Sequence, residues 1–262
     1  MPTDSSSLKS ICVASGKGGV GKTSFSVNLA ITLARQNLRV LLLDGDMGLA
    51  NIQIALNIRL PAKSFVSNES NSYKSFVVKT DFGFDLLPGS SGNKELANMN
   101  YERTINIVRN LDEFSLDYDI LVVDAAAGIS TAVLALLEST DIRLIIGTNE
   151  PASITDAYGL IKTLCEMDIK DNLYFIPNRV SAREGKNLFN KMNEVCLRFL
   201  SLELGFIGHL SDDPYMTTCW KKSTPIVEMA PHSQISLEID QLVATLLKIK
   251  LKPENGKIKF FK

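Results

Sequence analysis

Short runs of β-branched and leucine-rich residues recur along the chain, and segments with helical spacing separate them. The runs predict strands at residues 11–15, 39–43, 84–87, 120–123, 143–148, 173–177 and 206–208. Apolar residues at helical spacing predict helices at 23–36, 101–113, 132–139, 153–167, 182–203 and 234–251. Several strand segments are apolar on both faces, which is typical of strands that lie between two layers of helices.

The alternation of strands and helices predicts an α/β fold, because parallel strands need long crossover connections that are usually helical. We expect a doubly wound, mainly parallel sheet flanked by helices on both faces, in three layers, α/β/α. The chain has 262 residues, 45% of them hydrophobic, and it contains no low-complexity linker and no repeat. The simplest division is a single domain over residues 1–252, followed by a short basic and aromatic tail at 253–262.

Composition narrows the expected location and partners. A net charge of −1, from 28 basic and 29 acidic residues, argues against DNA as a partner. The polar start lacks the apolar run of a signal peptide, and no segment approaches the roughly 20 apolar residues of a membrane span. The four cysteines are far apart and form no C-x-x-C pair. We therefore expect reduced thiols in a cytoplasmic protein rather than a metal site or a disulfide framework.

Residues 14–26, ASGKGGVGKTSFS, carry the most specific pattern in the chain. From Gly16 to Thr23 they satisfy the phosphate-loop pattern G-x-x-x-x-G-K-[ST], between an apolar strand and a helix. The glycines let backbone N–H groups converge on phosphate oxygens, Lys22 would bridge the β- and γ-phosphates, and the Thr23 hydroxyl would ligate Mg²⁺. The nucleotide-binding residues expected here are Gly16, Lys17, Gly18, Gly19, Val20, Gly21, Lys22, Thr23 and Ser24.

Carboxylates end two other predicted strands. Asp44 and Asp46 follow a buried run in LLLDGDMGLAN, and at the carboxyl end of a parallel strand both can reach the crevice where ligands bind. From spacing alone, a solvated loop or a helix cap remains the alternative for this pair. Asp124 ends the hydrophobic run in YDILVVDAAAG, which has the Walker B form, in which the carboxylate holds Mg²⁺ through its water shell.

These segments together carry a family resemblance that covers nearly the whole chain. KGGVGKT with its second lysine, then DGDMGLAN, then DAAAG, resembles the deviant Walker A ATPases of the MinD/ParA class. TNEPASITDAYGLIKTL (148–164) and LLPGSSGNKELANM (86–99) resemble the FlhG branch, which comprises MinD-like regulators of flagellar number and placement. Two stretches depart from the family pattern. GHLSD (208–212) lacks the proline of G-x-I-P-x-D, and AA (125–126) follows Asp124 where relatives carry Ser or Thr and then Pro or Gly.

The resemblance implies catalytic roles for Lys17, Lys22 and Asp46. Lys17 resembles the lysine that reaches across a dimer interface to the phosphates of the partner. One lysine, Lys22, would then act in cis and the other in trans, as an arginine finger does. Asp46 is similar to the residue that orients the attacking water.

Two further roles follow from the same resemblance. Asp44 resembles a switch residue close to magnesium, so the implied metal ligands are Thr23, Asp44 and Asp124. Asn178, in FIPNRV, matches the asparagine that reads the adenine edge and completes the nucleotide-binding set, because an amide supplies both a donor and an acceptor. Without this context, Asn178 reads equally well as a turn residue after a strand.

The end of the chain, GKIKFFK, is basic and aromatic. MinD and its relatives typically close with a short amphipathic helix that binds the membrane when ATP drives dimerisation. By this resemblance Ile258, Phe260 and Phe261 would insert into an anionic inner-membrane leaflet, and the neighbouring lysines would meet its headgroups. The alternative is a basic tail whose aromatic side chains pack on the domain.

The sequence thus predicts a slow, Mg²⁺-dependent ATPase that dimerises with ATP and regulates flagellar number or placement at the membrane. A division-site regulator of the MinD type and a DNA-partition ATPase of the ParA type are the alternatives. The expected cofactors are ATP and Mg²⁺, and the expected partners are a second copy, an activating protein and anionic inner-membrane lipid. We expect a cytoplasmic protein that is peripheral on the cytoplasmic face of the membrane. An iron–sulfur carrier would need paired cysteines, which the chain lacks.

Overall fold

The computed structural model describes residues 8–46, 51–59, 73–89, 100–253 and 258–261. Within these ranges seven strands form one sheet, in the order β3-β4-β2-β5-β1-β6-β7. The strands are β1 (Ser10–Ser15), β2 (Val40–Gly45), β3 (Val78–Lys79), β4 (Asp85–Leu87), β5 (Ile120–Ala127), β6 (Ile142–Thr148) and β7 (Leu173–Asn178). Neighbouring strands are parallel, except that β3 runs antiparallel to β4. Parts of two segments that carry the family resemblance, residues 47–50 and 90–99, lie outside the described ranges.

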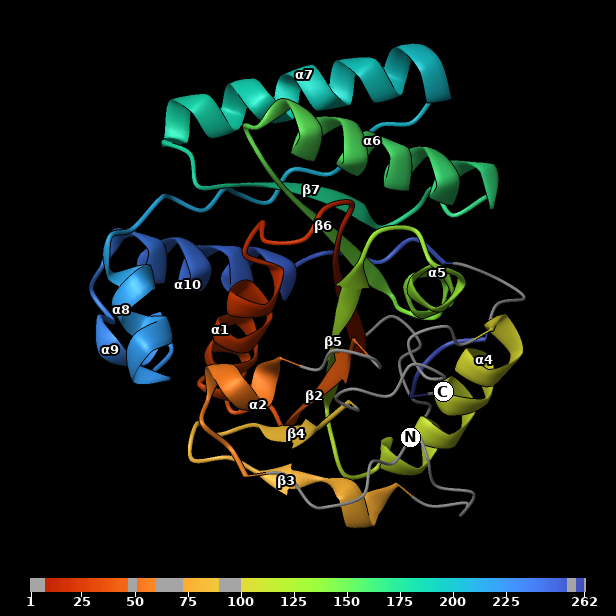
Figure 1. Cartoon of the computed structure of the whole chain (residues 1–262). Helices are drawn as coiled ribbons and strands as arrows, with labels where there is room; N and C mark the ends of the chain where they lie inside the picture. The colour runs from red at the N-terminus through yellow and green to blue at the C-terminus, as the bar shows by residue number, and fades with distance from the viewer. Residues whose placement is uncertain (1–7, 47–50, 60–72, 90–99, 254–257, 262) are drawn as a thin grey trace.

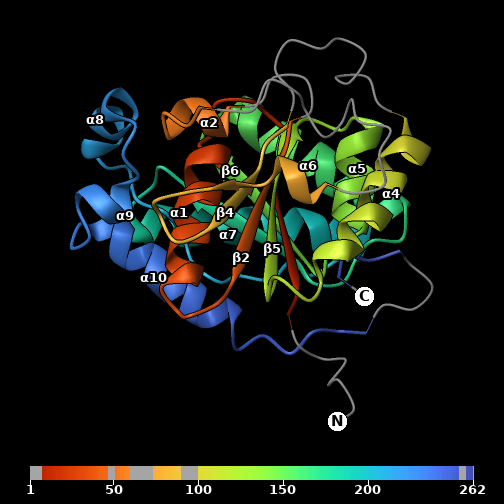
Figure 2. The same ribbon diagram turned by 90° about the horizontal axis from the view of Figure 1, so that it is seen from below.

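Helices cover both faces of this sheet (Figure 1, Figure 2). They are α1 (Lys22–Ala34), α2 (Ile52–Ala55), α4 (Tyr101–Asn110), α5 (Thr131–Glu138), α6 (Pro151–Glu166), α7 (Ala182–Leu200), α8 (Tyr215–Lys222), α9 (Ile226–Met229) and α10 (Gln234–Leu246). Two short 3-10 helices, η2 (Lys74–Phe76) and η3 (Leu111–Phe114), complete the described elements. Helices α1, α8, α9 and α10 pack on one face, and α4, α5, α6 and α7 pack on the other.

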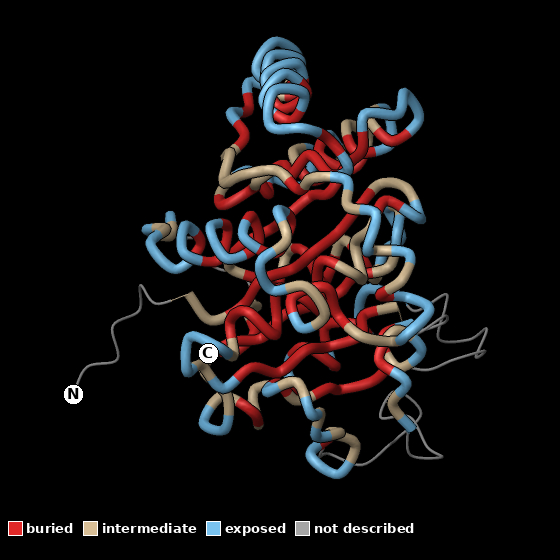
Figure 3. The backbone as a smooth tube through the Cα atoms, turned by 90° about the vertical axis from the view of Figure 1, so that its left-hand side faces the viewer, coloured by how far each residue is buried: buried red, intermediate tan, exposed pale blue. Residues whose placement is uncertain are grey.

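Strand β1 shows why the chain forms three layers. Ile11 and Val13 pack into the core beside α1 and α10, whereas Cys12 and Ala14 pack into the core beside α5 and α6. Successive side chains of a strand point to opposite faces, so an unbroken apolar run buries both faces at once. Buried residues accordingly run through the interior of the molecule, and exposed residues lie on the outer turns (Figure 3).

The strand order positions a crevice at the carboxyl end of β1. Strand β1 lies between β5 and β6, so the chain passes to β2 on one side of it and later to β6 and β7 on the other. In open α/β sheets, ligands bind where the strand order reverses in this way. The loop from β1 to α1 lies at this point, and so do the ends of β2 and β5.

The predicted doubly wound, three-layer α/β fold is confirmed, with one strand prediction wrong. Residues 206–208 do not form a strand, because backbone hydrogen bonds join this stretch to β7 only near its two ends, at Gly205 and Leu210. The two predicted helices 182–203 and 234–251 end earlier, at Leu200 and Leu246. The sequence pattern did not reveal β3, which has two residues, or α8, whose sequence YMTTCWKK divides equally between hydrophobic and polar residues.

The described part of the C-terminal tail packs against the domain. Phe260 and Phe261 are 2% and 1% exposed, and half-buried Ile258 packs against the same core. Lys259 Nζ donates to the backbone oxygens of Glu138 and Thr140 at 3.2 and 2.7 Å, just after α5, where carbonyl groups attract a cation. The tail thus has the packing of the alternative reading, in which its aromatic side chains lie on the domain, and contact of Ile258, Phe260 and Phe261 with a membrane stays a prediction. No helix in the described ranges has the length and apolar character needed to cross a membrane.

Candidate nucleotide site

The phosphate loop connects β1 to α1 at the carboxyl edge of the sheet. Gly16 faces α6 so closely that a Cβ there would lie 2.1 Å from the backbone oxygen of Asp156, so no larger residue fits. Gly21 has φ 97° and forms the N-cap of α1, a conformation that glycine adopts at little cost. Because α1 starts at Lys22, the first N–H groups of the helix are directed into the loop. This arrangement is the one that binds phosphate groups.

Asp124, on β5, gathers three side chains from the start of α1. Lys22 Nζ lies 3.0 Å from Oδ1, and the Thr23 hydroxyl donates to Oδ2 at 2.7 Å. Ser26, which is fully buried, donates its hydroxyl to Oδ1 at 2.8 Å. The structure thus brings together the predicted lysine, threonine and aspartate. Ser26 was not predicted, and its only signal is its position one helical turn after Thr23 on the same face.

Asp44 lies directly beside Asp124, in register across the parallel pair β2 and β5. It is 1% exposed, and its carboxylate accepts backbone N–H groups from Asp46, Asn51 and Ile52 at 3.1, 3.0 and 3.2 Å. Burial, followed by the neighbouring charge of Asp124, raises the pKa of Asp44 to about 7. Asp46 is held next to this pair by its backbone and is half-buried, while its role with the attacking water stays a prediction.

This donor set fits Mg²⁺. Asp44, Asp124 and the Thr23 hydroxyl offer only oxygen atoms, which are the ligands that magnesium prefers. A cation beside the two carboxylates would also offset the repulsion that raises the pKa of Asp44. In the described ranges no group of three or more His, Cys, Asp or Glu side chains could hold a metal. Phosphate and water oxygens would therefore supply the remaining ligands of an ion at this site, as is usual for Mg²⁺.

Lys17, the second lysine of the loop, points away from these carboxylates. Its Nζ lies 3.0 Å from Glu150 Oε2, at the start of α6, and the two side chains are 39% and 60% exposed. An ion pair this exposed contributes little stability and exchanges readily for another partner. Lys17 is thus accessible for a contact outside its own site. Glu150 was not predicted as its partner, because the two residues are 133 positions apart in the sequence.

Asn178, the last residue of β7, contacts the phosphate loop at Val20. Its Nδ2 donates to the backbone oxygen of Val20 at 2.6 Å, and its Oδ1 accepts the N–H of Arg179 at 2.9 Å. Arg179 has φ 58°, which is uncommon for a residue with a side chain and is often found at functional sites. The asparagine predicted to read a base is therefore adjacent to the loop predicted to hold the phosphates.

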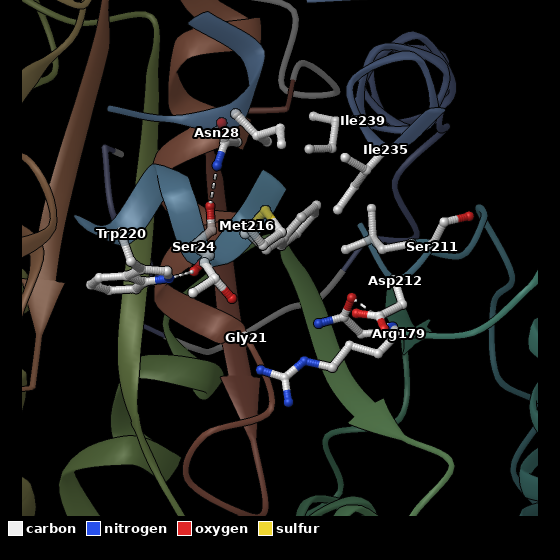
Figure 4. Close-up of a pocket in the computed structure, with 15 residues that line it drawn as sticks. Gly21, Ser24, Asn28, Arg179, Ser211, Asp212, Met216, Trp220, Ile235 and Ile239 are labelled. Atoms are coloured by element: carbon white, nitrogen blue, oxygen red, sulfur yellow. Dashed lines mark hydrogen bonds between the residues drawn. The ribbon is translucent and has the colours of Figure 1, made fainter. Parts of the chain in front are cut away.

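A pocket of about 140 Å³ opens beside this asparagine (Figure 4). Its lining comes from the phosphate loop and α1, the end of β7, the segment after residue 209, α8, α9 and α10. The residues are Gly21, Ser24, Phe25, Asn28, Asn178, Arg179, Leu210, Ser211, Asp212, Met216, Thr217, Trp220, Ile226, Ile235 and Ile239. Arg179 extends across the pocket toward Gly21, with Asp212 beside it (Figure 4). The pocket is apolar on its α10 side and polar at its rim, which is the usual character of a small-molecule site.

Comparison with known families agrees with this geometry. The sequence model described as "CobQ/CobB/MinD/ParA nucleotide binding domain" matches residues 11–219. The chain belongs to this family. The matched range runs from β1 through most of α8, and it includes the phosphate loop, both buried carboxylates and Asn178.

Individual members of the family narrow the resemblance. Antiactivator FleN of Pseudomonas aeruginosa is 34% identical over 87% of this chain and 82% of its own length. Flagellum site-determining protein YlxH of Helicobacter pylori is 32% identical over 97% of this chain and 88% of its own. The septum site-determining protein MinD of Pyrococcus horikoshii, solved with Mg-ADP, is 19% identical, with a TM-score of 0.73 over 92% of this chain and 96% of its own. The first two confirm the predicted resemblance to the FlhG branch, and the third shows the shared fold.

One further contact links the pocket of this MinD/ParA-family chain to its phosphate loop. Trp220 on α8, the only tryptophan in the sequence, donates its Nε1–H to Ser24 Oγ at 3.0 Å. Ser24 is one of the residues predicted to bind nucleotide. No sequence pattern connects the two residues, because helix α8 was not predicted. Trp220 is 43% exposed, so its fluorescence can report on what enters the site.

Proposed function

We propose that this chain is a magnesium-dependent ATPase that works as a dimerising switch in the control of flagellar number or placement. One observation carries the enzymatic part: Lys22, Thr23 and Ser26 converge on Asp124 directly below a phosphate loop. A purely structural glycine turn needs neither the lysine nor the hydroxyl at these positions. The family to which the chain belongs supports nucleotide as the ligand.

Each residue has a definite task in this proposal. The N–H groups of the loop and Lys22 hold the phosphates of ATP, and the nucleotide takes Lys22 and Thr23 over from Asp124. Mg²⁺, when bound, neutralises charge on the phosphate oxygens, and Thr23, Asp44 and Asp124 would hold it. Asp46, at the end of β2, orients the attacking water. Asn178 and the pocket beside it take the adenine base.

Lys17 makes the proposed switch a dimer. Its side chain is exposed and, within the described ranges, pairs with exposed Glu150, so little is lost when it moves to a second copy. A lysine supplied in trans stabilises the negative charge that develops on the transferred phosphoryl group, as an arginine finger does. ATP then favours the dimer, and slow hydrolysis returns the chain to the monomer.

The biological role rests on the relatives. FleN is named an antiactivator and YlxH a flagellum site-determining protein, and both match most of this chain at 34% and 32% identity. These names support a flagellar role over the septum-site role of MinD proteins, which is the second candidate. We further propose an activating protein partner, because such slow switches are reset by a second protein. The four free cysteines are consistent with a reducing compartment, and we infer a cytoplasmic location.

The proposal is tested by measuring ATP hydrolysis together with molecular mass in solution, with ATP and with ADP. We expect a monomer with ADP, a dimer with ATP and Mg²⁺, and hydrolysis that stops when Mg²⁺ is removed. Lys17→Ala should lower hydrolysis by about 10³-fold and abolish the dimer, while nucleotide binding stays within about threefold of wild type. The matched control is Lys162→Ala, which removes a similarly exposed ion pair, to Glu166 near the end of α6, whose side chains are 53% and 64% exposed.

Two results would contradict this account. If the wild type neither binds nor hydrolyses ATP, the enzymatic proposal fails. If Lys17→Ala hydrolyses ATP at the wild-type rate as a monomer, the chain is an ATPase but not a switch that depends on a second copy.

A further inference from the structure

The segment after residue 209 forms one wall of the pocket beside Asn178. Leu210 N–H donates to the backbone oxygen of Pro177 at 2.9 Å, and Val180 N–H donates back to Leu210 at 3.2 Å. These two bonds tie the segment to the end of β7. They bring Ser211 and Asp212, which follow directly, to the pocket rim. The backbone of this rim, however, has no regular strand to fix its position beyond Leu210.

A buried carboxylate holds the rim at Ser211. Glu238, on α10, is 6% exposed. Its Oε2 accepts the N–H of Ser211 at 2.7 Å, and its Oε1 accepts the Ser211 hydroxyl at 2.6 Å. Gln234, one turn earlier on α10, donates to Oε1 at 3.0 Å. His209 Nε2 lies 3.3 Å from the same oxygen without the geometry of a hydrogen bond, so the contacts with Ser211 and Gln234 are the ones that hold the carboxylate.

Glu238 supplies the hydrogen-bond acceptors that a serine at position 211 requires. The family pattern G-x-I-P-x-D has proline here, which fixes φ and carries no N–H group. Ser211 has two hydrogen-bond donors that proline lacks, its backbone N–H and its hydroxyl, and its backbone is less restricted. A donor that is buried without an acceptor lowers the stability of the fold. Glu238 accepts both donors at once. The same helix presents Ile235 and Ile239 to the pocket, so Glu238 joins the apolar floor of the pocket to its polar rim.

We infer that Glu238 is a positioning residue for the base side of the nucleotide site. Its carboxylate holds Ser211, and through it Asp212, at the fixed distance from Asn178 that a purine base needs. The inference rests on the proposed function, in which this pocket takes the base of ATP. It assigns to Glu238 no contact with the nucleotide and no part in the chemistry at the phosphates.

Glu238→Gln tests the inference with almost no change in shape. The amide keeps an acceptor oxygen at one of the two positions and places an NH₂ group at the other, where it faces either the N–H of Ser211 or the side-chain donor of Gln234. We expect the Kd for ATP to rise about tenfold, equivalent to about 1.4 kcal/mol. The Kd for inorganic tripolyphosphate, which has no base, should stay within about twofold. In hydrolysis assays the KM for ATP should rise while kcat at saturating ATP is unchanged, because the phosphate side is untouched.

Two further variants sharpen the test. Glu228→Gln makes the same chemical change in a carboxylate that pairs with Arg35 at the surface, and both Kd values should stay unchanged. Ser211→Ala removes only the hydroxyl donor and should raise the Kd for ATP by about threefold. Its effect should largely disappear when it is combined with Glu238→Gln, because the two side chains act as one unit. Hydrogen exchange at the N–H of residue 211 should be faster in Glu238→Gln.

Each remaining outcome overturns a definite part of the account. If Glu238→Gln weakens ATP and tripolyphosphate equally, the residue supports the fold in general and the positioning role is wrong. If the variant binds ATP as tightly as wild type does, the inference fails and the proposed function stands. If wild type binds tripolyphosphate but shows no preference for ATP over it, the pocket takes no base, and the proposed function fails along with the inference.

Discussion

The phosphate side of the site comes from one continuous loop, the start of α1 and the ends of two adjacent strands, whereas the base side combines the start of α1 with several segments between residues 178 and 239. On the phosphate side, Asp124 alone meets Lys22, Thr23 and Ser26. On the base side the contacts are separate pairs that share no common residue: Asn178 reaches Val20, and Ser211 reaches Glu238.

The difference reflects how each side recognises its part of the ligand. Phosphate groups carry charge, and a helix N-terminus, a lysine and buried carboxylates bind them through a few strong interactions that a short motif can encode. A base is neutral and flat, so its pocket depends on shape and on a small number of well-placed polar groups. Substitutions should therefore have large effects on the phosphate side and moderate effects on the base side.

The largest effect is expected at Asp124. Asp124→Asn removes the charge that faces Lys22 and the oxygen that would share Mg²⁺, and hydrolysis should fall by about 10³-fold at saturating ATP. Phosphate release measures this change. Asp119→Asn is the control, because Asp119 loses only an exposed pair with Arg39 and should leave the rate within about twofold. If Asp124→Asn keeps a tenth of the wild-type rate, the expectation that substitutions on the phosphate side have larger effects than those on the base side is wrong.

A moderate effect is expected at Asn178, which touches both sides. Asn178→Ala removes the base-reading amide and also the bond to Val20 that supports the loop. The Kd for ATP should rise about tenfold and that for tripolyphosphate about threefold. Isothermal titration measures both values. An equal loss for the two ligands would make Asn178 a support for the loop alone, and no loss for tripolyphosphate would separate the two sides completely.

The smallest effect is expected at Trp220, at the edge of the pocket. Trp220→Phe keeps an aromatic ring but removes the donor to Ser24, and the Kd for ATP should change by less than about threefold. In wild type, the fluorescence of this single tryptophan should change more with ATP than with tripolyphosphate. A change larger than tenfold in the Kd would mean that α8 contributes to affinity as much as β7 does.

The same contrast explains what the sequence could predict. Most strands and the phosphate loop are contiguous patterns, so their positions, and the convergence of Lys22, Thr23 and Asp124, could be predicted before the fold was known. Asp44 could be predicted as well, because the carboxyl ends of parallel strands meet at one edge of the sheet. Glu238 could not, since only the packing of α10 against the segment after residue 209 brings it to Ser211.

The packing of the tail could not be predicted from the sequence for a different reason. Phenylalanines flanked by lysines suit an anionic membrane and a protein core equally well, because both environments take apolar rings and place cations against oxygen atoms. Only the contacts distinguish the two. Lys259 bonds to the carbonyl groups at the end of α5, and Phe260 N–H donates to the backbone oxygen of Ser139 at 3.0 Å. A pattern of residue types does not contain this information.

The central claim is that Lys17 completes the site of a second copy, and mixing two inactive variants tests it most directly. Lys17→Ala keeps an intact site but lacks the lysine, whereas Asp124→Asn has the lysine but a defective site. If Lys17 acts in trans, each mixed dimer contains one trans lysine and one complete site, so an equimolar mixture should recover activity up to about a quarter of the wild-type rate, the value for random pairing. A mixture no more active than the sum of its two components would contradict the account and return Lys17 to its own nucleotide.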